Sequence, residues 1–304
     1  MKTEKFDPSI TQPLAIVIAM LILAGTVVGS EPRETVLHHF HFGTDGAAPY
    51  GRLISDAAGN LYGTTQFRGI YGGQCGAFGC GTVFKIDPSG KETVLHSFRS
   101  KDGAWPLSGL IGDAQGNLYG TTELGGDLTG GCGTLGCGVV FKIDRSGHET
   151  VLYSFTGGAD GSQSAGSLVR DAAGNMYGTT GLGGDLTCNA PSGCGVVFKI
   201  DSSGHETVLH SFQGQPSDGW DPIAGLVRDS AGNFYGTTYR GGTYGFGTVF
   251  KVDTTGKETV LYSFTGGSDG SAPYAGLIRD SSNNLYGTTV GGGQGFGVVF
   301  KLTP

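Results

Sequence analysis

Short apolar runs separated by polar turns follow one another along this chain from residue 34 onward. In residues 225–264 the runs are GLVRD, NFYGTT, GTVFKVD and ETVLYSF, and the linkers between them are rich in Gly, Asn, Ser and Thr. Runs of about 4 to 7 residues rich in Val, Phe, Tyr and Thr between such linkers are typical of antiparallel strands joined by tight turns. The unit shows no helical spacing of apolar residues. The pattern therefore predicts an all-β fold.

The same unit recurs through the rest of the chain. The ETVL run begins at Glu34, Glu92, Glu149, Glu206 and Glu258. The G[TV]VFK run, or its equivalent, ends at Lys85, Lys142, Lys199, Lys251 and Lys301. Regular recurrence of a unit with four strands favours a β-propeller over a solenoid.

The two ends of the repeat array indicate how the propeller closes. The run ETVLHHF at 34–40 has no strands before it, and VVFK at 298–301 is not followed by an ETVL strand. Pairing the two would remove two open sheet edges. We therefore predict a five-bladed β-propeller of four-stranded antiparallel blades, closed by the N-terminal strand 34–40. The blades span about 50–98, 109–155, 166–212, 224–264, and 275–302 together with 34–40.

Residues 1–30 differ from the repeats. Lys2 and Lys5 precede an apolar run at 14–28, followed by Gly29 and Ser30, which is the order of a secretory signal peptide. An uncleaved N-terminal anchor is the alternative, although the apolar run is shorter than the ~20 residues of a membrane span. We expect residues 31–304 to be one propeller domain without a membrane span, monomeric, and either secreted or held in the cell envelope.

Composition narrows the function classes. Glycine accounts for 59 of 304 residues and falls mainly in the linkers between strands, as a β-repeat protein requires. The net charge is −7, and no basic stripe is visible. Because a nucleic-acid-binding protein needs such a stripe, we expect no nucleic-acid partner.

The repeat itself resembles a known family. Units of the form G-L-[IV]-x-D-x-x-G-N-x-Y-G-T-T, followed by G-[TV]-V-F-K and E-T-V-L-Y-S-F, are similar to the GloVer (Gloeo/Verruco) repeats of secreted bacterial proteins, over residues 34–304. The resemblance implies export and, in some members, a C-terminal surface anchor. No such tail follows the last repeat here, so release is expected rather than attachment. The resemblance implies no reaction and supplies no catalytic residues.

All six cysteines lie in the loop between the second and third strands of three blades. They form three close pairs: Cys75 and Cys80, Cys132 and Cys137, and Cys188 and Cys194. Local pairs in an exported chain predict three disulfides. Zinc binding is the alternative, but the pairs belong to separate blades, whereas zinc sites combine close pairs or add His.

Two sets of aspartates invite a functional interpretation. The D-x-x-G-N and D-x-x-G-[KH] turns recur in nearly every blade, so we interpret them as hairpin turns. The Asp-Gly connections on the opposite, variable face hold Asp45, Asp102, Asp160, Asp218 and Asp269. Near them are the residues that break the repeat: Tyr50, Trp105, Trp220, Asp221 and Tyr274. Aromatic rings beside carboxylates suit sugar binding, and the alternative is that these residues make turns and fill gaps between blades.

We interpret the chain as a secreted, non-catalytic module that binds an extracellular glycan or protein through this face. One alternative is a glycan-active hydrolase or lyase that uses two of Asp102, Asp218 and Asp221 at the channel mouth. Another is a structural envelope or matrix protein. We expect no cofactor and no metal. His38, His39 and His41 look like a metal cluster, but His38 has equivalents at His96 and His210 in other blades.

Overall fold

A computed structural model describes residues 33–70 and 75–304, of which Leu37–Pro304 form one compact unit. The predicted signal peptide at 1–30 lies outside the described residues. In the part of the chain that is described, no helix is long and apolar enough to cross a membrane.

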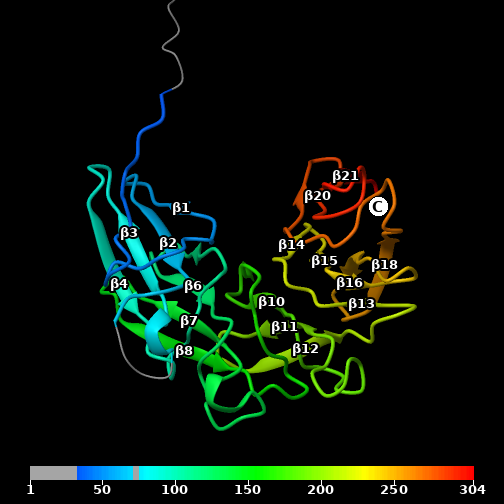
Figure 1. The fold of residues 1–304 in the computed structure, drawn as a ribbon, viewed down its shortest axis with the longest axis horizontal. Coiled ribbons are helices and arrows are strands. Elements are labelled where there is room, and N and C mark those ends of the chain that lie inside the picture. Colours follow the sequence, from blue (N-terminus) through cyan, green and yellow to red (C-terminus); the bar gives the residue numbers. More distant parts are fainter. Residues whose placement is uncertain (1–32, 71–74) are drawn as a thin grey trace, which may run out of the picture. The chain divides into compact units, whose positions relative to one another are not determined.

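The fold is all-β, and its sheets follow one another along the chain (Figure 1). The first sheet consists of β1 (Ile54–Ser55), β2 (Leu61–Thr65), β3 (Thr82–Ile86) and β4 (Glu92–Ser97). The second consists of β5 (Ile111–Gly112), β6 (Leu118–Thr121), β7 (Val139–Ile143) and β8 (Glu149–Ser154). The third consists of β9 (Val169–Arg170), β10 (Met176–Thr180), β11 (Val196–Ile200) and β12 (Glu206–Ser211).

The fourth sheet consists of β14 (Val227–Arg228), β15 (Phe234–Thr238), β17 (Thr248–Val252) and β18 (Glu258–Ser263). The fifth has three strands: β19 (Ile278–Arg279), β20 (Leu285–Thr288) and β21 (Val299–Leu302). A two-stranded ribbon joins β13 (Gly219–Trp220) to β16 (Arg240–Gly241). Two short 3-10 turns, η1 (Gly76–Phe78) and η2 (Gly133–Leu135), lie in the cysteine loops.

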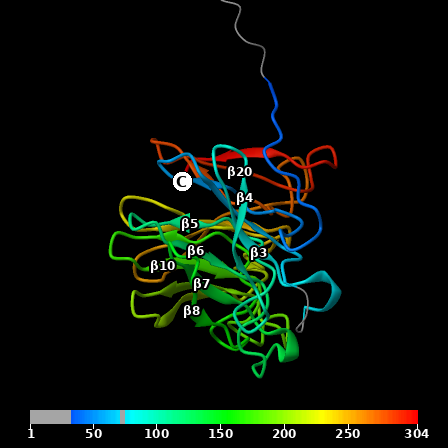
Figure 2. The same cartoon turned by 90° about the vertical axis from the view of Figure 1, so that its left-hand side faces the viewer.

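Within each sheet the strands are antiparallel and keep their order in the chain, as β6, β7 and β8 show in Figure 2. A glycine on the second strand faces the Phe of the third strand. At Gly120 an added Cβ would lie 2.7 Å from Cζ of Phe141. The glycine in the recurrent YGTT run therefore makes room for the neighbouring ring.

The main core lies between successive sheets. Phe98, which follows β4, and Phe141, on β7, are both fully buried, and their ring centroids are 5.1 Å apart in an edge-to-face contact. The contact recurs at the next two boundaries, as Phe155 with Phe198 and Phe212 with Phe250. Each apolar strand thus buries its ring against the following sheet, which explains why the VFK and ETVL runs recur together.

The recurrent Asp turns are confirmed as structural. Asp56 accepts hydrogen bonds from the backbone N–H groups of Ala58 and Asn60, from the side-chain amide of Asn60 and from the hydroxyl of Tyr62. Corresponding bonds hold Asp113 in the second sheet. These hydrogen bonds hold the pKa of Asp56 at about 2, because they favour the ionised carboxylate.

The all-β fold of successive antiparallel sheets is confirmed, whereas the number of blades and the closure are not. β21 pairs with β20, and residues 34–40 form no strand in the structure. The side chain of Val299 on β21 is 82% exposed. Phe40 packs edge-to-face on Phe84 at 5.2 Å, which is the contact that Phe98 makes with Phe141. We call the last strand of each four-stranded sheet its outer strand. Phe40 therefore takes the same place on the first sheet as the Phe after each outer strand takes on the sheet that follows.

Candidate functional site

Titratable side chains gather where the outer strand of one sheet meets the outer strand of the next. We call each such place a seam. The first His seam consists of His96 on β4, Asp102 in the connection that follows, and Glu149 at the start of β8. The second His seam consists of His210, Asp218 and Glu258. The seam between them along the chain has Tyr153, Asp160 and Glu206, and we call it the Tyr seam.

The local sequence places these groups together. His96 and Glu92 lie on β4, so each outer strand carries a Glu at its start and a His or Tyr near its end. The chain then makes a tight turn in which Ser100 pairs with Gly103. Asp102 lies in this turn and accepts the backbone N–H of Arg99 at 2.6 Å. The turn thereby directs the other carboxylate oxygen towards the strand that the chain has just left.

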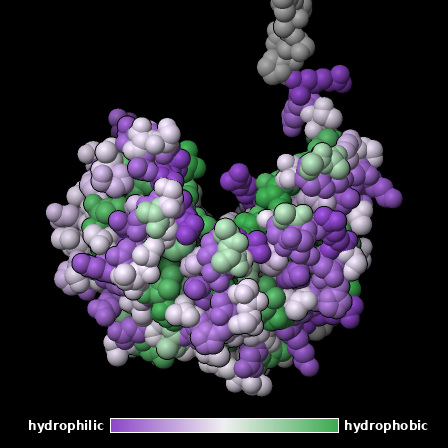
Figure 3. Space-filling model, turned by 180° about the vertical axis from the view of Figure 1, so that it is seen from behind, coloured by the Kyte–Doolittle hydropathy of each residue, from purple (hydrophilic) through white to green (hydrophobic). Residues whose placement is uncertain are grey.

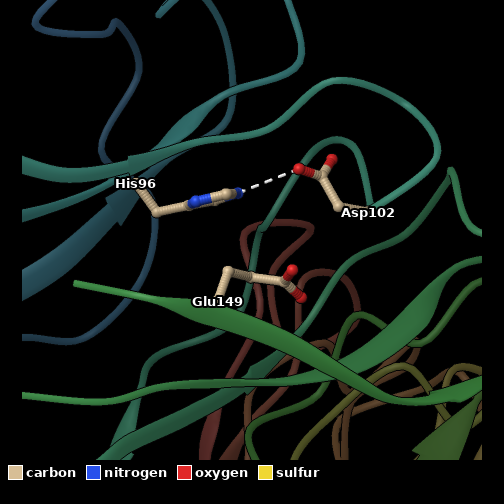
Figure 4. A group of neighbouring side chains, drawn as sticks. All are labelled: His96, Asp102 and Glu149. Atoms are coloured by element: carbon tan, nitrogen blue, oxygen red, sulfur yellow. Dashed lines mark hydrogen bonds and ion pairs between the residues drawn. The ribbon is translucent and has the colours of Figure 1, made fainter. Parts of the chain in front are cut away.

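The first His seam brings three different side chains together (Figure 4). His96 Nε2 lies 3.1 Å from Asp102 Oδ2, and the two side chains are 18% and 22% exposed. Glu149 approaches from the neighbouring sheet and points its carboxylate towards both, so that donor atoms of all three residues lie within 4.8 Å of one another. The second His seam repeats this geometry, with His210 Nε2 at 3.0 Å from Asp218 Oδ2.

Burial sets the electrostatics of the seams. The pKa of Glu149 is raised to about 7, mainly by burial, while the charge of His96 lowers it and that of Asp102 raises it. One oxygen of Glu149 is buried without a hydrogen-bond partner among the described residues. The pKa values of Glu206 and Glu258 are also raised to about 7, again mainly by burial. The pKa of the glutamate is raised whether a His or a Tyr lies beside it, so the shift comes from the place of the glutamate in the repeat.

The Tyr seam has a similar turn that is one residue longer, and Tyr takes the place of His. The hydroxyl of Tyr153 donates to Asp160 at 3.0 Å, and the backbone N–H of Thr156 donates to the same carboxylate oxygen at 2.8 Å. The pKa of Tyr153 is raised by burial and by this hydrogen bond to an anion. All five connection aspartates accept a backbone N–H in their own turn: Asp45, Asp102, Asp160, Asp218 and Asp269.

The structure thus places Asp102 and Asp218, two of the predicted catalytic candidates, against outer strands rather than at a channel mouth. Their position has a simple cause: each aspartate binds the end of the strand before it, and that strand is the outer one. Sequence reasoning identified these aspartates but missed Glu149 and Glu258. Both belong to the recurrent ETVL run, and their contacts cross from one sheet to the next.

The two tryptophans are half-buried and do not form an open platform. The ring of Trp105 contacts Phe67 edge-to-face at 5.7 Å and lines a cavity of about 180 Å³ that Cys75 and Leu135 also line. The guanidinium of Arg240 lies 5.1 Å from the ring centroid of Trp220. Both indole N–H groups are buried without a hydrogen-bond partner among the described residues.

The predicted tyrosines are the exposed aromatic residues of this group. Tyr50 is 70% exposed and Tyr274 is 59% exposed. Tyr274 contacts Tyr239 edge-to-face at 6.1 Å, and the guanidinium of Arg240 lies 5.6 Å from the ring of Tyr239. On the face drawn in Figure 3, hydrophilic and hydrophobic residues alternate over short distances.

Asp221 is the third predicted catalytic candidate, and it lies apart from the seams. Its backbone has a φ of 64°, and its carbonyl accepts the N–H of Tyr239. Burial raises the pKa of its carboxyl, while the charge of Arg240 lowers it. One carboxylate oxygen lies 2.9 Å from where a Cβ on Gly181 would be. A side chain at position 181 would therefore occupy the space that Asp221 uses.

Glu123 is a functional candidate that sequence reasoning missed. It follows β6 as Gly181 follows β10 and Tyr239 follows β15, so it has the same place in its sheet. Burial raises the pKa of its carboxyl, and no charged neighbour opposes the shift. The sequence did offer a hint, because the residue after the invariant GTT differs in every repeat. It is Gln66, Glu123, Gly181, Tyr239 or Val290.

The three predicted disulfides are all present. They join Cys75 to Cys80, Cys132 to Cys137, and Cys188 to Cys194. Cys80, Cys137 and Cys194 are fully buried at the boundary with the following sheet. The disulfides thus tie the long loops to the inter-sheet core and take no part in a metal site.

Sequence comparison identifies the repeat. The family described as Gloeobacter/Verrucomicrobia repeat matches residues 23–190 and 186–304, which bears out the resemblance drawn from the motifs. A search of the curated proteins finds no match.

Solved structures of similar fold have low sequence identity. A gluconolactonase from Xanthomonas campestris is 14% identical with a TM-score of 0.49, over 82% of this chain and 71% of that one. A luciferin-regenerating enzyme is 13% identical with a TM-score of 0.49, over 85% of this chain and 92% of that one. These likenesses concern a propeller-like fold and carry no argument about substrate.

The expectation of a non-catalytic binding module is corrected by these findings. A propeller-like fold is all that the similar structures support, and a fold by itself gives no ground for a non-catalytic role. The variable face also contains two half-buried carboxyls with raised pKa values, Asp221 and Glu123, which binding alone does not require.

Proposed function

Since the chain belongs to the Gloeobacter/Verrucomicrobia repeat family, whose recurrent residues build turns and inter-sheet packing here, we propose that its function lies with residues that break the repeat. The function that these residues support best is a glycan-active hydrolase or lyase. Asp221 and Glu123 are its acid–base residues. The observation that carries the proposal is the half-buried carboxyl of Asp221, near Arg240, at a position that no other repeat fills with an acid.

The two carboxyls have environments that suit different roles. Burial raises the pKa of Glu123 with no charge opposing it, so of the two carboxyls we assign it the role of general acid. Asp221 is also half-buried, but the guanidinium of Arg240 favours its ionised form, so it serves as base or nucleophile. Its oxygen lies over Gly181, which takes the place of Glu123 in the next sheet. Asp221 thus lies against the position in the third sheet that corresponds to Glu123 in the second.

Aromatic side chains near Asp221 supply the binding surface. Tyr274 is exposed and contacts Tyr239, whose neighbour Arg240 stacks over Trp220. The C–H groups of a sugar ring pack on such faces, and its hydroxyls hydrogen-bond to carboxylate and guanidinium groups. Asp102 and Asp218 are not part of this site, because both are bound in the seams.

The test is glycan cleavage by the full-length chain. A panel of polysaccharides is incubated with the protein, reducing ends are counted, and absorbance of unsaturated products separates a lyase from a hydrolase. Asp221→Asn and Glu123→Gln are each expected to lower kcat by at least about 100-fold, as loss of a general acid or base does. Tyr274→Ala is expected to raise KM and leave kcat nearly unchanged.

The matched control is Asp253→Asn, which removes a turn carboxylate of the fourth sheet and leaves Asp221 and Glu123 intact. Cleavage that survives in Asp221→Asn, or no cleavage of any glycan in the panel, would overturn the proposal.

Closure and export complete the proposal. The closed five-bladed ring, with 34–40 as the missing outer strand of the last blade, is supported by a groove of about 400 Å³ along β21. Tyr262, Phe264 and residues 298–302 line it. Export of the domain 31–304 is supported by its three disulfides, since disulfides persist in oxidising compartments. An extracellular glycan is then the substrate that the chain meets.

A further inference from the structure

The two His seams combine side chains that metal ions bind. Each offers one imidazole nitrogen and two carboxylate groups, and in each the donor atoms lie within 4.8 Å of one another. Imidazole and carboxylate ligands together suit divalent transition metals, and Zn²⁺ commonly takes three protein ligands and a water. We propose that each His seam binds one divalent transition-metal ion, for which Zn²⁺ is the probe. This proposal does not rest on the catalytic role of Asp221.

The distances fit a metal ion between the His and the Asp. Two ligands of a tetrahedral Zn²⁺, each at roughly 2.0–2.1 Å from the metal, lie roughly 3.3 Å apart. His96 Nε2 and Asp102 Oδ2 are 3.1 Å apart, and the corresponding atoms of His210 and Asp218 are 3.0 Å apart. The observed His–Asp separations are thus shorter than the ideal one by roughly a few tenths of an ångström, and the two side chains would need to move apart by only that much to bind the ion.

The glutamate supplies the third ligand from the neighbouring sheet. Glu149 and Glu258 each have one carboxylate oxygen that is buried and finds no hydrogen-bond partner among the described residues, as do Glu92 and Glu206, but only Glu149 and Glu258 among them join a close group with an imidazole. A buried carboxylate without a partner is costly, and metal coordination removes that cost. In Figure 4 the carboxylate of Glu149 lies on the side of His96 and Asp102 that faces β8. The bound ion would therefore join two outer strands, β4 and β8.

The backbone already fixes the aspartate ligands. Asp102 uses its other oxygen to accept the N–H of Arg99 at 2.6 Å. Asp218 likewise accepts the N–H of Gly219 at 2.6 Å with the oxygen that faces away from His210. Hydrogen bonds of this kind orient a ligand and raise the affinity of a metal site. The seams are also open enough for an ion to enter, since the His side chains are 18% and 19% exposed.

The Tyr seam explains why the sequence did not reveal these sites. Tyr153 replaces the imidazole there, and its hydroxyl donates a hydrogen bond to Asp160 instead. The prediction of no metal rested on the recurrence of His38 at His96 and His210. The structure gives that recurrence another meaning at His96 and His210, because each meets an Asp from the turn that follows and a Glu from the next sheet, whereas His38 Nε2 lies 3.5 Å from Asp45 and belongs to no such close group among the described residues.

The test is zinc binding by the full-length chain after treatment with a chelator. Isothermal titration is expected to show two zinc ions per chain, and zinc is expected to raise the Tm. His96→Tyr and His210→Tyr are each expected to leave one ion bound, and the double variant none. Tyr is a conservative choice, because the repeat already accommodates it at position 153.

His148→Tyr is the matched control, since His148 is exposed and lies outside the seams; it is expected to leave both ions bound. His210→Ser provides a second variant if the Tyr substitution disturbs folding at that position. The proposal would be overturned by a stripped chain that takes up no zinc, or by binding that persists in the double variant.

Discussion

The first His seam and the Tyr seam share their strands and packing, and they differ in the aromatic residue that meets the aspartate and in the length of the turn. In both, an outer-strand Phe packs on the next sheet at 5.1 Å, as Phe98 on Phe141 and Phe155 on Phe198. In both, burial raises the pKa of the incoming glutamate to about 7. The group that meets the aspartate changes from the nitrogen of His96 to the hydroxyl of Tyr153, and the turn that holds the aspartate is one residue longer in the Tyr seam.

The difference separates what folds the chain from what gives a seam its chemistry. The packing, the turn aspartate and the glutamate are common to both seams, so they are needed to hold one sheet on the next. The imidazole is not needed for that, because Tyr153 satisfies its aspartate equally well. The fold therefore does not require the imidazole, which can bind a ligand instead. The shared packing, the disulfides and the glutamate can each be tested in both seams.

The shared packing carries the largest expected effect. Phe98→Ala and Phe155→Ala each remove a fully buried ring, and we expect each to lower the free energy of unfolding by about 3–5 kcal/mol. Chemical denaturation measures the loss. Phe78→Ala, at a ring that is 61% exposed, is the control and should cost less than about 0.5 kcal/mol. Unequal costs at the two buried sites would break the comparison.

The disulfides come next in size. Cys75–Cys80 lies beside Ser100 in the first His seam, and Cys132–Cys137 lies beside Gly157 in the Tyr seam. Each closes a short loop, so replacing either pair with serine should lower stability by about 2 kcal/mol, less than a 15-residue loop would give. Denaturation with and without reductant measures the loss. A change several-fold larger at one seam would show that the loop there has a further structural role.

The smallest effect is a pH dependence at Glu206. Its pKa is about 7 in the folded chain and 4.5 ordinarily, so the folded state favours the protonated form. The resulting stabilisation is fully present below pH 4.5 and is lost as the pH rises through about 7. Glu206→Gln should raise the Tm at pH 8 by roughly 1–3 °C and leave it nearly unchanged at pH 4.5. A Tm difference that is the same at both values would contradict the assignment.

Much of this fold was predictable from the sequence. The strands, the turn aspartates and the three disulfides depend on residues close together in the chain, such as Asp56 with Asn60 and Cys132 with Cys137. Turn chemistry and strand periodicity are local, so a single repeat contains the information, and the recurrence of the repeat confirms it. The local elements therefore follow from the sequence alone.

The sites were less predictable because they depend on burial and on contacts between repeats. Trp105 and Trp220 attract attention in the sequence, yet both are half-buried. Glu123 stands where the other repeats have Gln, Gly, Tyr or Val, so the sequence shows only that an acid is present there. Its pKa is raised because the fold buries it, which the sequence does not show. Glu149 looks like one more copy of a repeated residue until the fold brings it to His96. The repeat pattern predicts where a residue lies within its own sheet, but it does not predict which residues of the adjacent sheet contact it.

Each outer strand takes part in two seams. On β8, Glu149 reaches back to the preceding sheet, and Tyr153 reaches forward to Asp160 and the following one. Each repeat therefore carries both halves of a seam, one that contacts the preceding repeat and one that contacts the following repeat. A duplicated unit would bring with it both halves that its neighbours require. An ancestral array could thus lengthen by whole repeats without redesign, and a single His-to-Tyr change could later alter one seam while leaving every other intact.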